Sequence, residues 1–543
     1  MDLVKELQKA VAAAADVEAS SVHLEHPQDL SHGDYATNIA MTLAKERGVN
    51  PKELAEEIIK KIDLPFVEEV SVAGPGFINF KLSREFFTGS LKVIGSLGRL
   101  WGSNTNNVDH KVIMEYVNAN AFKQLHIGHL MGATIGESIA RLLQFSGAEV
   151  KKESYGGDVG PHAAKAVYGL RKLQKELSPA VIGEAYALGA KEYEENDSAK
   201  EEIDILNKAI YAGEDKDLMK EHEEGRKVSI EGVQEILDVL DIKLDRFIFE
   251  SESAPYGMKL VEEGLKKGVF VESDGAVIYE GEKKGLHTRV FKTKQGTPTY
   301  EAKELGLETI KDEWWEHDQS IVLTGKEQAE YFKVIKEALS EIHPEQAEKI
   351  THLSNGLMKL SEGKMSSRTG DIVTAKSLID NLVEKVKEQN PDEETARKVA
   401  VAAIKYSILR QQPGGDIVFD VNNSLSTEGD SGPYLQYALV RAKKILADSS
   451  KDDADAVAPE QPYDLEKILY RFPEVVARAQ EKYEPHHVTG FLTELASEFN
   501  SFYAKEKILG GEYEGYKLLL IEAFVLTMTN GLWLLGIEAP EKM

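Results

Sequence analysis

His126, Gly128 and His129 are the residues of this sequence whose types and spacing most directly suggest chemistry. Three interpretations are open. Histidines three positions apart on a helix could ligate a metal, although the glutamate of an H-E-x-x-H motif is missing and no third ligand is near. They could instead be hydrogen-bonded core histidines. They could also form a phosphate site, because glycine allows close backbone approach and a helix N-terminus supplies amide donors.

A second segment, "KMSSR" at residues 364–368, favours the phosphate interpretation. A loop that carries Lys364 and Ser366 can close over a triphosphate and neutralise the charge that develops at the α-phosphate when pyrophosphate leaves. Alone, this segment would be typical of a solvated basic loop. Together the two motifs predict a nucleotide site.

The elements that must position these motifs alternate between strand and helix. "VIMEYV" is an apolar run typical of a buried parallel strand, and we expect a helix from about His129 to Phe145, a stop at Gly147 and a strand in "AEVKKESY". "SIVLTG", "KEQAEYFKVIKEAL" and "KITHLSNGLMKL" continue the alternation. The fold class predicted for residues 106–395 is therefore α/β, with a doubly wound, Rossmann-like parallel sheet.

Two further domains are expected beside this one. Residues 1–105 indicate an α+β domain, with a helix at Leu3–Ala15, Asn50 as an N-cap before Pro51, and two strands separated by the Gly74–Gly76 break. Residues 396–543 predict an all-α domain. The charged stretch at about 165–250 is expected to be a helical insertion in the α/β pattern, with a solvated surface.

Composition limits the classes of function. The chain has 543 residues, too many for one core, and no cysteine, so disulfides and thiolate zinc sites are excluded. The N-terminus lacks the apolar core of a signal peptide, and we interpret the apolar stretch at residues 516–537 as a buried helix rather than a membrane span. A net charge of −27 argues against generic coating of nucleic acid. We expect a cytoplasmic protein without membrane contact, monomeric by default.

The two motifs resemble the HIGH and KMSKS signatures of class I aminoacyl-tRNA synthetases. More narrowly, the chain resembles the arginyl-tRNA synthetase family along nearly its whole length. The similar segments, in order, are "AGPGFINFKLS", "MEYVNANAFKQLHIGHLMGATIGESIARLL", "SYGGDVGPH", "GTPTYEAKELG", "DSGPYLQYALVRAKKIL" and "LLGIEAPEKM". Six separated matches in one order are not expected by chance.

The resemblance implies two reactions. Arginine attacks the α-phosphate of ATP to give arginyl-adenylate, and the terminal ribose hydroxyl of tRNA(Arg) then accepts the arginyl group. Mg²⁺ would accompany the ATP phosphates, and no covalent protein nucleophile is expected, because such chemistry depends on positioning and charge stabilisation.

The resemblance also implies residue roles around ATP. The residues expected to bind ATP are His126, Gly128, His129, Gly157, Asp158, Lys364 and Met365, and those expected to be catalytic are Lys123, His126, His129, Lys364 and Ser366. Ser367 stands where the second lysine of KMSKS usually lies. We therefore assign the transition-state phosphate charge to Lys123, which precedes the HIGH segment, although the lysine could be a solvated loop residue.

The resemblance implies an acidic pocket for arginine, whose guanidinium needs carboxylates and planar acceptors. The expected residues are Glu115, Asn118, Asn120, His129, Tyr300, Glu304 and Gln328. Glu304 stands where the family commonly has aspartate, so the longer arm changes the pocket geometry. Tyr155 and Gly156 should lie at the edge of the same crevice, where the strand ends.

For tRNA, the expected contacts are Tyr434, Gln436, Tyr437 and Arg441 in the helical domain, with Lys443 and Lys444 beyond, and Phe77 and Asn79 for the tRNA elbow. Aromatic side chains beside cations suit unpaired RNA bases. The apolar neighbours Leu435, Ala438 and Leu439 indicate that the same helix packs into a core, so the tyrosines could equally be structural.

Two alternatives stay open at this point. The chain could be a class I synthetase for another amino acid, although Glu115 and Glu304 favour a cationic substrate. It could also be a catalytically silent tRNA-binding paralogue, against which the intact His126, His129 and Lys364 argue.

Overall fold

The computed structural model describes residues 3–27, 29–361, 373–449 and 456–543. The chain forms two compact units, each assembled from separate segments. Unit 1 consists of Met1–Gly102, Arg441–Glu474 and Glu494–Asn530, and unit 2 of Ser103–Val440, Val475–Thr493 and Gly531–Met543. Two stretches of the expected C-terminal helical domain, Arg441–Glu474 and Glu494–Asn530, therefore belong to the same compact unit as the N-terminal segment.

Unit 1 contains a three-stranded antiparallel sheet in the order β1-β3-β2. Its strands are β1 (Tyr35–Thr37), β2 (Val67–Ala73) and β3 (Phe77–Leu82), and its N-terminal helices are α1 (Leu3–Ala15), α2 (Ile39–Arg47), α3 (Pro51–Ile59) and α4 (Arg84–Leu97). Asn50 caps α3 as expected, because its side chain accepts hydrogen bonds from the amides of Lys52 and Glu53. Tyr470, from the C-terminal half of the chain, is part of the same apolar core as Leu7 and Phe80.

The C-terminal part of the chain is helical, as predicted. Its helices are α17 (Gly432–Asp448), α18 (Asp464–Leu469), α19 (Phe472–Glu481), α20 (His486–Lys505) and α21 (Glu514–Leu534). Helix α21 is long and apolar enough to cross a membrane, but 67% of its most apolar window is buried inside the protein. That burial is the property of a core helix and fits the interpretation of this stretch from the sequence.

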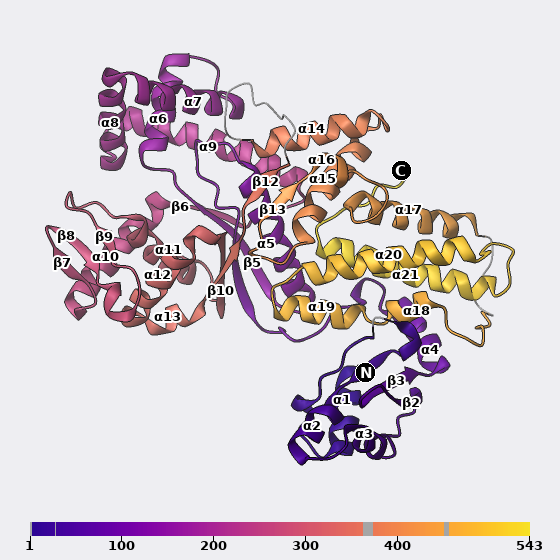
Figure 1. The fold of residues 1–543 in the computed structure, drawn as a ribbon. Helices are drawn as coiled ribbons and strands as arrows, with labels where there is room; N and C mark the ends of the chain where they lie inside the picture. Colours follow the sequence, from indigo (N-terminus) through magenta and orange to yellow (C-terminus); the bar gives the residue numbers. More distant parts are fainter. Residues whose placement is uncertain (1–2, 28, 362–372, 450–455) are drawn as a thin grey trace. The chain divides into compact units, whose positions relative to one another are not determined.

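Unit 2 is built on a five-stranded parallel sheet in the order β11-β10-β4-β5-β6. The strands are β4 (Lys111–Glu115), β5 (Glu149–Gly156), β6 (Arg246–Phe249), β10 (Gln319–Gly325) and β11 (Ile350–Asn355). From β4 the chain first adds strands on one side and then returns to add β10 and β11 on the other (Figure 1). This reversal makes the carboxyl ends of β4 and β10 a topological switch point, where open α/β sheets bind ligands.

Helices connect the strands of this sheet (Figure 1). The connecting helices are α5 (Ile127–Phe145), α6 (Pro161–Leu173), α7 (Pro179–Glu195), α8 (Asp197–Ala212), α9 (Lys216–Val239), α10 (Glu250–Lys267), α11 (Tyr300–Trp314), α12 (Ala329–Ile342) and α13 (Pro344–Lys349). The last elements before the C-terminal helices are β12 (Met358–Leu360), α14 (Ala375–Lys387), α15 (Glu393–Leu409), β13 (Ile417–Phe419) and α16 (Val421–Ser424). The doubly wound fold class is thus confirmed.

Two small sheets were not expected from the sequence. The strands β7 (Val271–Ser273), β8 (Ala276–Tyr279) and β9 (Arg289–Lys292) form an antiparallel sheet between α10 and α11. Strand β13 pairs with β12 in parallel, inside a stretch expected to be helical. These strands are three or four residues long, too short for a clear period-two pattern.

Candidate active site

The loop between β4 and α5 has an unusual backbone. Val117, Asn118 and Phe122 all have positive φ, at 74°, 52° and 64°. A β-branched residue such as Val117 rarely adopts this left-handed conformation, and a residue held there costs about 1–3 kcal/mol. Such strain persists only where surrounding contacts impose it, and it is concentrated at functional sites.

Three hydrogen bonds hold this loop in place. The Ala119 amide donates to Ser154 Oγ (3.2 Å), the Ala121 amide to the Gly157 carbonyl (2.9 Å), and the Phe122 amide to Ser229 Oγ of α9 (2.7 Å). A Cβ on Gly156 would lie 1.9 Å from the Ala119 carbonyl oxygen, so only glycine lets the loop cross the end of β5.

The charged insertion packs against this loop. Phe122 has no exposed surface and belongs to one apolar cluster with Ala163 of α6 and Ile203 of α8. The expectation of a solvated helical surface was therefore incomplete, because one face of the insertion buries the loop residue. Helices α6 to α9 thus help to fix the segment that leads into the HIGH motif.

His126 and His129 together cap helix α5. His126 is the N-cap residue, and its Nδ1 accepts a hydrogen bond from the Gly128 amide (3.0 Å). His129 Nδ1 accepts from the His126 amide (3.1 Å), and the two rings lie 3.9 Å apart. A Cβ on Gly128 would lie 2.8 Å from His126 Cε1, so the glycine makes room for the folded-back imidazole.

These caps determine what the imidazoles can donate. Burial and the nearby charge of Lys123 lower the pKa of His126. Burial, His126 and Lys123 lower the pKa of His129 to about 3. Both rings are therefore neutral at pH 7, and because each Nδ1 accepts a bond, each proton sits on Nε2. Two Nε2–H donors at a helix N-terminus suit phosphate oxygens.

The metal interpretation of these histidines finds no support in the described parts of the chain, where neither belongs to a group of three ligating side chains. The group that could hold an ion is Glu484, His486 and His487, whose ligand atoms lie within 4.8 Å of one another. Glu484 already accepts a hydrogen bond from Gln412 (2.7 Å) and contacts His487 (2.8 Å).

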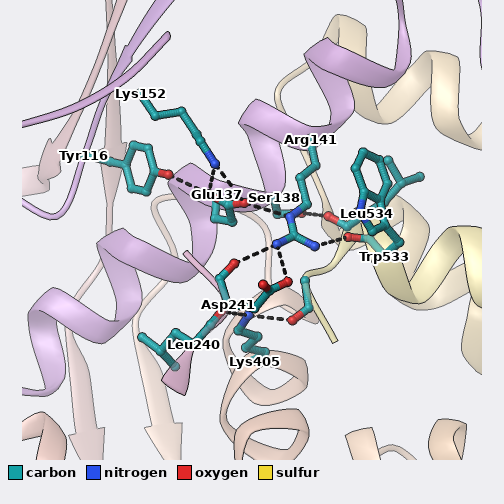
Figure 2. Close-up of polar contacts among 11 residues, drawn as sticks. Tyr116, Glu137, Ser138, Arg141, Lys152, Leu240, Asp241, Lys405, Trp533 and Leu534 are labelled. Carbon is teal, nitrogen blue, oxygen red and sulfur yellow. Dashed lines mark hydrogen bonds and ion pairs between the residues drawn. The ribbon is translucent and has the colours of Figure 1, made fainter. Parts of the chain in front are cut away.

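Helix α5 is fixed from behind by a buried network of charges, drawn in Figure 2. Glu137 receives hydrogen bonds from Tyr116 Oη (2.6 Å) and Arg141 Nε (2.8 Å), and pairs with Lys152 Nζ (3.1 Å). Arg141 in turn binds the carbonyl and carboxylate of Asp241, at 2.8 and 2.9 Å. The network ties α5 to β4, β5 and the end of the insertion.

The same network reaches a distant segment of the chain (Figure 2). Arg141 Nη1 donates to the Trp533 carbonyl (3.0 Å), and Ser138 Oγ to the Leu534 carbonyl (2.8 Å). The buried Lys405 ammonium donates to the carbonyls of Leu240 and Gly536, both at 2.5 Å. The carbonyls of the last two residues of α21 therefore anchor the helix that begins at His126.

A cavity of about 510 Å³ opens at the carboxyl ends of β4, β5 and β10. Its walls bring together the expected residues Glu115, Asn118, Asn120, Tyr155, Gly156, Gly157, Tyr300, Glu304 and Gln328. The other lining residues are Glu250, Arg289, Glu301, Thr324, Glu327, Tyr331 and Phe332. Neither His126, His129 nor Lys123 lines this cavity.

Buried carboxylates dominate one wall of the cavity. Glu115 Oε2 lies 2.7 Å from Lys311 Nζ, which also contacts Glu308 (2.6 Å) and, at 3.7 Å, Glu153. Glu304 Oε1 is buried and meets no hydrogen-bond donor among the described residues. Burial raises the pKa of Glu115, raises that of Glu153 to about 8, and raises that of Glu304 well above its usual range.

A second ion pair, between Lys303 and Glu250, lies at another part of the cavity wall. Lys303 Nζ donates to Glu250 (2.6 Å) and lies 5.2 Å from the ring centre of Tyr300, whose side chain is 65% exposed. Burial raises the pKa of Glu250, and Lys303 opposes this shift. Asn120 Oδ1 accepts from the Gly157 amide (2.8 Å), and Asn118 Nδ2 donates to the Leu323 carbonyl (3.0 Å).

Two expected ATP residues have other contacts. The Asp158 side chain is fully buried, and its carboxylate receives bonds from Arg226 (2.7 Å) and from the Ser251 amide (3.0 Å). It therefore positions α9 and α10 rather than facing the cavity. The Lys123 ammonium lies 5.5 Å from the ring centre of Tyr186, and burial lowers its pKa. Lys364, Met365 and Ser366 lie outside the described residues.

The expected tRNA residues differ in exposure. Tyr437 is 36% exposed, whereas Gln436 is fully buried and donates to the carbonyls of Lys398 (3.1 Å) and Glu538 (2.5 Å). Asn79 is also buried, in the middle of β3. The remaining candidates are Tyr434, which is half-buried, Phe77, which is half-buried, and Arg441, which donates to Asn500 (2.9 Å).

Sequence reasoning missed the internal cations and carboxylates of the pocket wall, above all Lys311 and Glu308. A signal was present, because Glu304, Glu308 and Lys311 follow the i, i+4, i+7 spacing of one helix face. Charged residues at positions where a helix against a sheet should be apolar point to a buried polar network.

Fold and site together define a class of protein: a doubly wound parallel sheet whose first crossover helix begins at an H-I-G-H motif is the catalytic architecture of class I aminoacyl-tRNA synthetases. A family profile described as "tRNA synthetases class I (R), catalytic domain" matches residues 96–421. Profiles for the arginyl-tRNA synthetase N-terminal domain and the DALR anticodon binding domain match residues 1–82 and 435–543. The chain belongs to the arginyl-tRNA synthetase family.

Individual relatives agree over the full length. The chain is 29% identical to an arginine–tRNA ligase of Clostridium kluyveri, with 100% of both chains covered. It is 30% identical to an arginine–tRNA ligase of Methanosphaera stadtmanae, covering 96% of this chain and 95% of that protein. Among solved structures, the arginyl-tRNA synthetase of Thermus thermophilus is similar with a TM-score of 0.82, 26% identity and complete coverage of both chains.

Proposed function

We propose that this protein is an arginine–tRNA ligase, which activates arginine with ATP and transfers it to tRNA(Arg). The observation that carries the proposal is the cavity, in which the buried and unpaired Glu304 carboxylate lies among other acidic residues. A buried carboxylate without a cation is costly, and a guanidinium in reach of it removes the cost. The acidic lining favours arginine over neutral amino acids.

On the ATP side, the neutral His126 and His129 donate their Nε2–H groups to phosphate oxygens at the start of α5. Gly128 permits this arrangement, and we assign Gly157, which follows β5 and lines the cavity, to the ATP side of that cavity. We assign closure over the phosphates to Lys364, Met365 and Ser366, and the charge of the α-phosphate in the transition state to Lys123. Mg²⁺ arrives as part of the MgATP substrate.

On the amino-acid side, Glu304 receives the guanidinium and Glu115 accepts the α-ammonium group. Asn118 and Asn120 shape the floor at the end of β4, and Tyr300 and Gln328 close the outer side. His129 was also expected to bind arginine, but it does not line the cavity, so we assign it to the ATP side, where the carboxylate of arginine must reach the α-phosphate.

For tRNA, we propose that Tyr434, Tyr437 and Arg441 contribute to the anticodon surface and that Phe77 faces the elbow. The buried Gln436 and Asn79 act by supporting these surfaces. We further propose that the enzyme is cytoplasmic and that it is a monomer. Sedimentation at micromolar concentration tests the oligomeric state.

Arginine-dependent exchange of pyrophosphate with ATP tests the function. We expect exchange with arginine, measured with and without tRNA, and none with lysine or with citrulline, the neutral isostere of arginine. Exchange with another amino acid but not arginine would refute the specificity. The absence of exchange with every amino acid, tRNA included, would refute the enzymatic function.

The role of Lys123 gives a separate prediction. Lys123→Ala should slow adenylate formation about 100- to 1,000-fold, the usual loss when one charge-stabilising donor is removed, and leave arginine affinity nearly unchanged. Rapid-quench kinetics and equilibrium binding measure the two quantities. Lys191→Ala, which removes an exposed lysine of the insertion, is the matched control. Equal losses in rate and affinity would contradict the assignment.

A further inference from the structure

Lys311 lies in the wall behind the cavity and makes no contact with solvent. Its side chain is 0% exposed, and its ammonium lies 2.7 Å from Glu115 and 2.6 Å from Glu308. It also donates to Ser320 Oγ (3.1 Å) and lies 3.7 Å from Glu153. Of these three carboxylates, only Glu115 lines the cavity.

Some of the carboxylates near this lysine contact its ammonium directly, and another, Glu304, has a buried oxygen without a hydrogen-bond donor among the described residues. Glu115 and Glu308 are in direct contact with the ammonium. Glu304 stands on the same helix, seven residues before Lys311, and lines the cavity with one oxygen that meets no donor among the described residues. Four buried carboxylates (Glu115, Glu153, Glu304 and Glu308) thus interact with a single ammonium.

We propose that Lys311 is a positioning residue for amino-acid binding: as the permanent counter-ion of Glu115, it leaves Glu304 as the buried cavity carboxylate that has no cationic partner among the described residues and receives the cationic side chain of the substrate. This inference rests on the proposed function. Without the lysine, Glu115 would be a second uncompensated buried carboxylate and would take up a proton. A protonated Glu115 no longer attracts the α-ammonium group of arginine.

The other charged groups around Glu304 do not replace Lys311. Arg289, which lines the same cavity, is paired with Glu301 (3.3 Å). Glu250 lies at the start of α10 and is already paired with Lys303 of α11. Tyr155 of β5 and Tyr331 of α12 are partly buried, and desolvation raises the pKa of both phenols well above the usual range, so both stay neutral. The ammonium of Lys311 is therefore the internal cation in direct contact with Glu115.

Lys311→Met tests the proposal in the full-length enzyme. We expect the KM for arginine to rise about tenfold or more, and the pH at which arginine binding is half-maximal to rise by roughly one unit, because one unit corresponds to a tenfold change. The KM for ATP should stay within about threefold of the original value, a limit well below that tenfold change. Lys311→Arg should restore arginine binding. Unchanged arginine binding in Lys311→Met, or equal losses for ATP and arginine, would overturn the proposal.

Glu308→Gln provides a test in the opposite direction. Glu308 contacts Lys311 but does not line the cavity, and its charge raises the pKa of both Glu115 and Glu304. Its removal frees Lys311 for Glu115, so arginine binding should persist to lower pH. This variant decides the question if Lys311→Met does not fold, and a midpoint that stays or moves upward would overturn the proposal.

The wild-type enzyme separates this inference from the function on which it rests. If the wild type fails to attach arginine to tRNA, the proposed function is wrong. If the wild type is active and the two variants do not shift the pH midpoint in opposite directions, only the role of Lys311 is wrong.

Discussion

Glu304 shows how a single buried carboxylate can couple substrate binding to proton release. Burial, together with the charges of Glu115, Glu308 and Glu250, raises the pKa of Glu304 well above its usual range. Burial therefore favours the protonated form of this group in the empty cavity. An arginine side chain favours the ionised form, so the guanidinium must displace the proton.

We therefore expect arginine affinity to increase with pH, by up to about tenfold per unit while Glu304 is protonated in the free enzyme. Titration calorimetry in buffers of different ionisation enthalpy should detect the released proton. Glu304→Gln should weaken binding and remove this pH dependence. Glu316→Gln, at a side chain that is 93% exposed, is the control. Proton uptake, or an affinity independent of pH, would contradict the expected linkage.

Residue types could be predicted from the sequence, but their burial could not. Glu115, Asn120 and Tyr300 line the cavity as expected. Gln436, by contrast, follows a helical pattern that fits an RNA surface and a core equally well, and only the packing of the neighbouring segments decides that it is buried. Lys311 escaped notice because its partner Glu115 is almost 200 positions away in the sequence.

At the scale of elements, the first turn of α5 depends on the absence of a side chain at Gly128. Gly128→Ala would place a Cβ 2.8 Å from His126 Cε1 and 3.0 Å from its Nδ1. The imidazole must then leave its capping position, which displaces the Nε2–H donor. We expect the rate of pyrophosphate exchange to fall about 10- to 100-fold, less than the roughly 100- to 1,000-fold loss for a deleted donor, because the imidazole is displaced and not removed.

Gly89→Ala in α4 is the matched control, because a Cβ there meets no atom within 4 Å. It should leave the exchange rate unchanged and increase the free energy of unfolding by about 0.5–1 kcal/mol, since alanine is the better helix former. Kinetic assays and urea titration measure the two effects. Equal activity of both alanine variants would refute the role assigned to the capping histidine.

The long elements were predictable and the short ones were not. The apolar run of β4, the stop after α5 and the strand β5 follow directly from residue pattern. The predicted start of α5 at His129 was two residues late, because a histidine N-cap is unusual and only the side-chain bonds of His126 reveal it. The strands β7 to β9 owe their existence to packing against α11 and α12, which no local pattern records.

At the scale of the whole molecule, unit 1 is held together by contacts between segments that are far apart in sequence. Glu466 of α18 accepts hydrogen bonds from Arg84 Nη1 of α4 (2.8 Å) and from Tyr516 Oη of α21 (2.5 Å). Its side chain is 1% exposed. One carboxylate therefore joins all three segments of the unit.

Glu466→Ala should lower the free energy of unfolding by about 3–5 kcal/mol, because it leaves a partly buried guanidinium and a buried phenol without their acceptor. Glu460→Ala removes an exposed carboxylate of the same segment and should change stability by less than about 0.5 kcal/mol. Urea titration followed by fluorescence compares the two. A similar stability for both variants would show that the three segments do not depend on Glu466.

The class of each domain could be predicted from the sequence, but the grouping of segments could not. Three consecutive domains were expected, and no pattern in the third of them indicates that Tyr470 packs into the core formed by Leu7 and Phe80. Residue patterns report which face of an element is buried, not which distant element buries it.

The anchor behind α5 has a consequence for the synthesis of the protein. Arg141 and the Trp533 carbonyl are 392 positions apart, and Lys405 binds the Gly536 carbonyl from 131 positions away. A ribosome that has completed α5 must therefore add hundreds of residues before these acceptors exist. The nascent chain carries an incomplete support for its catalytic helix until residues 533–536 have been added, and contacts of high sequence separation form late.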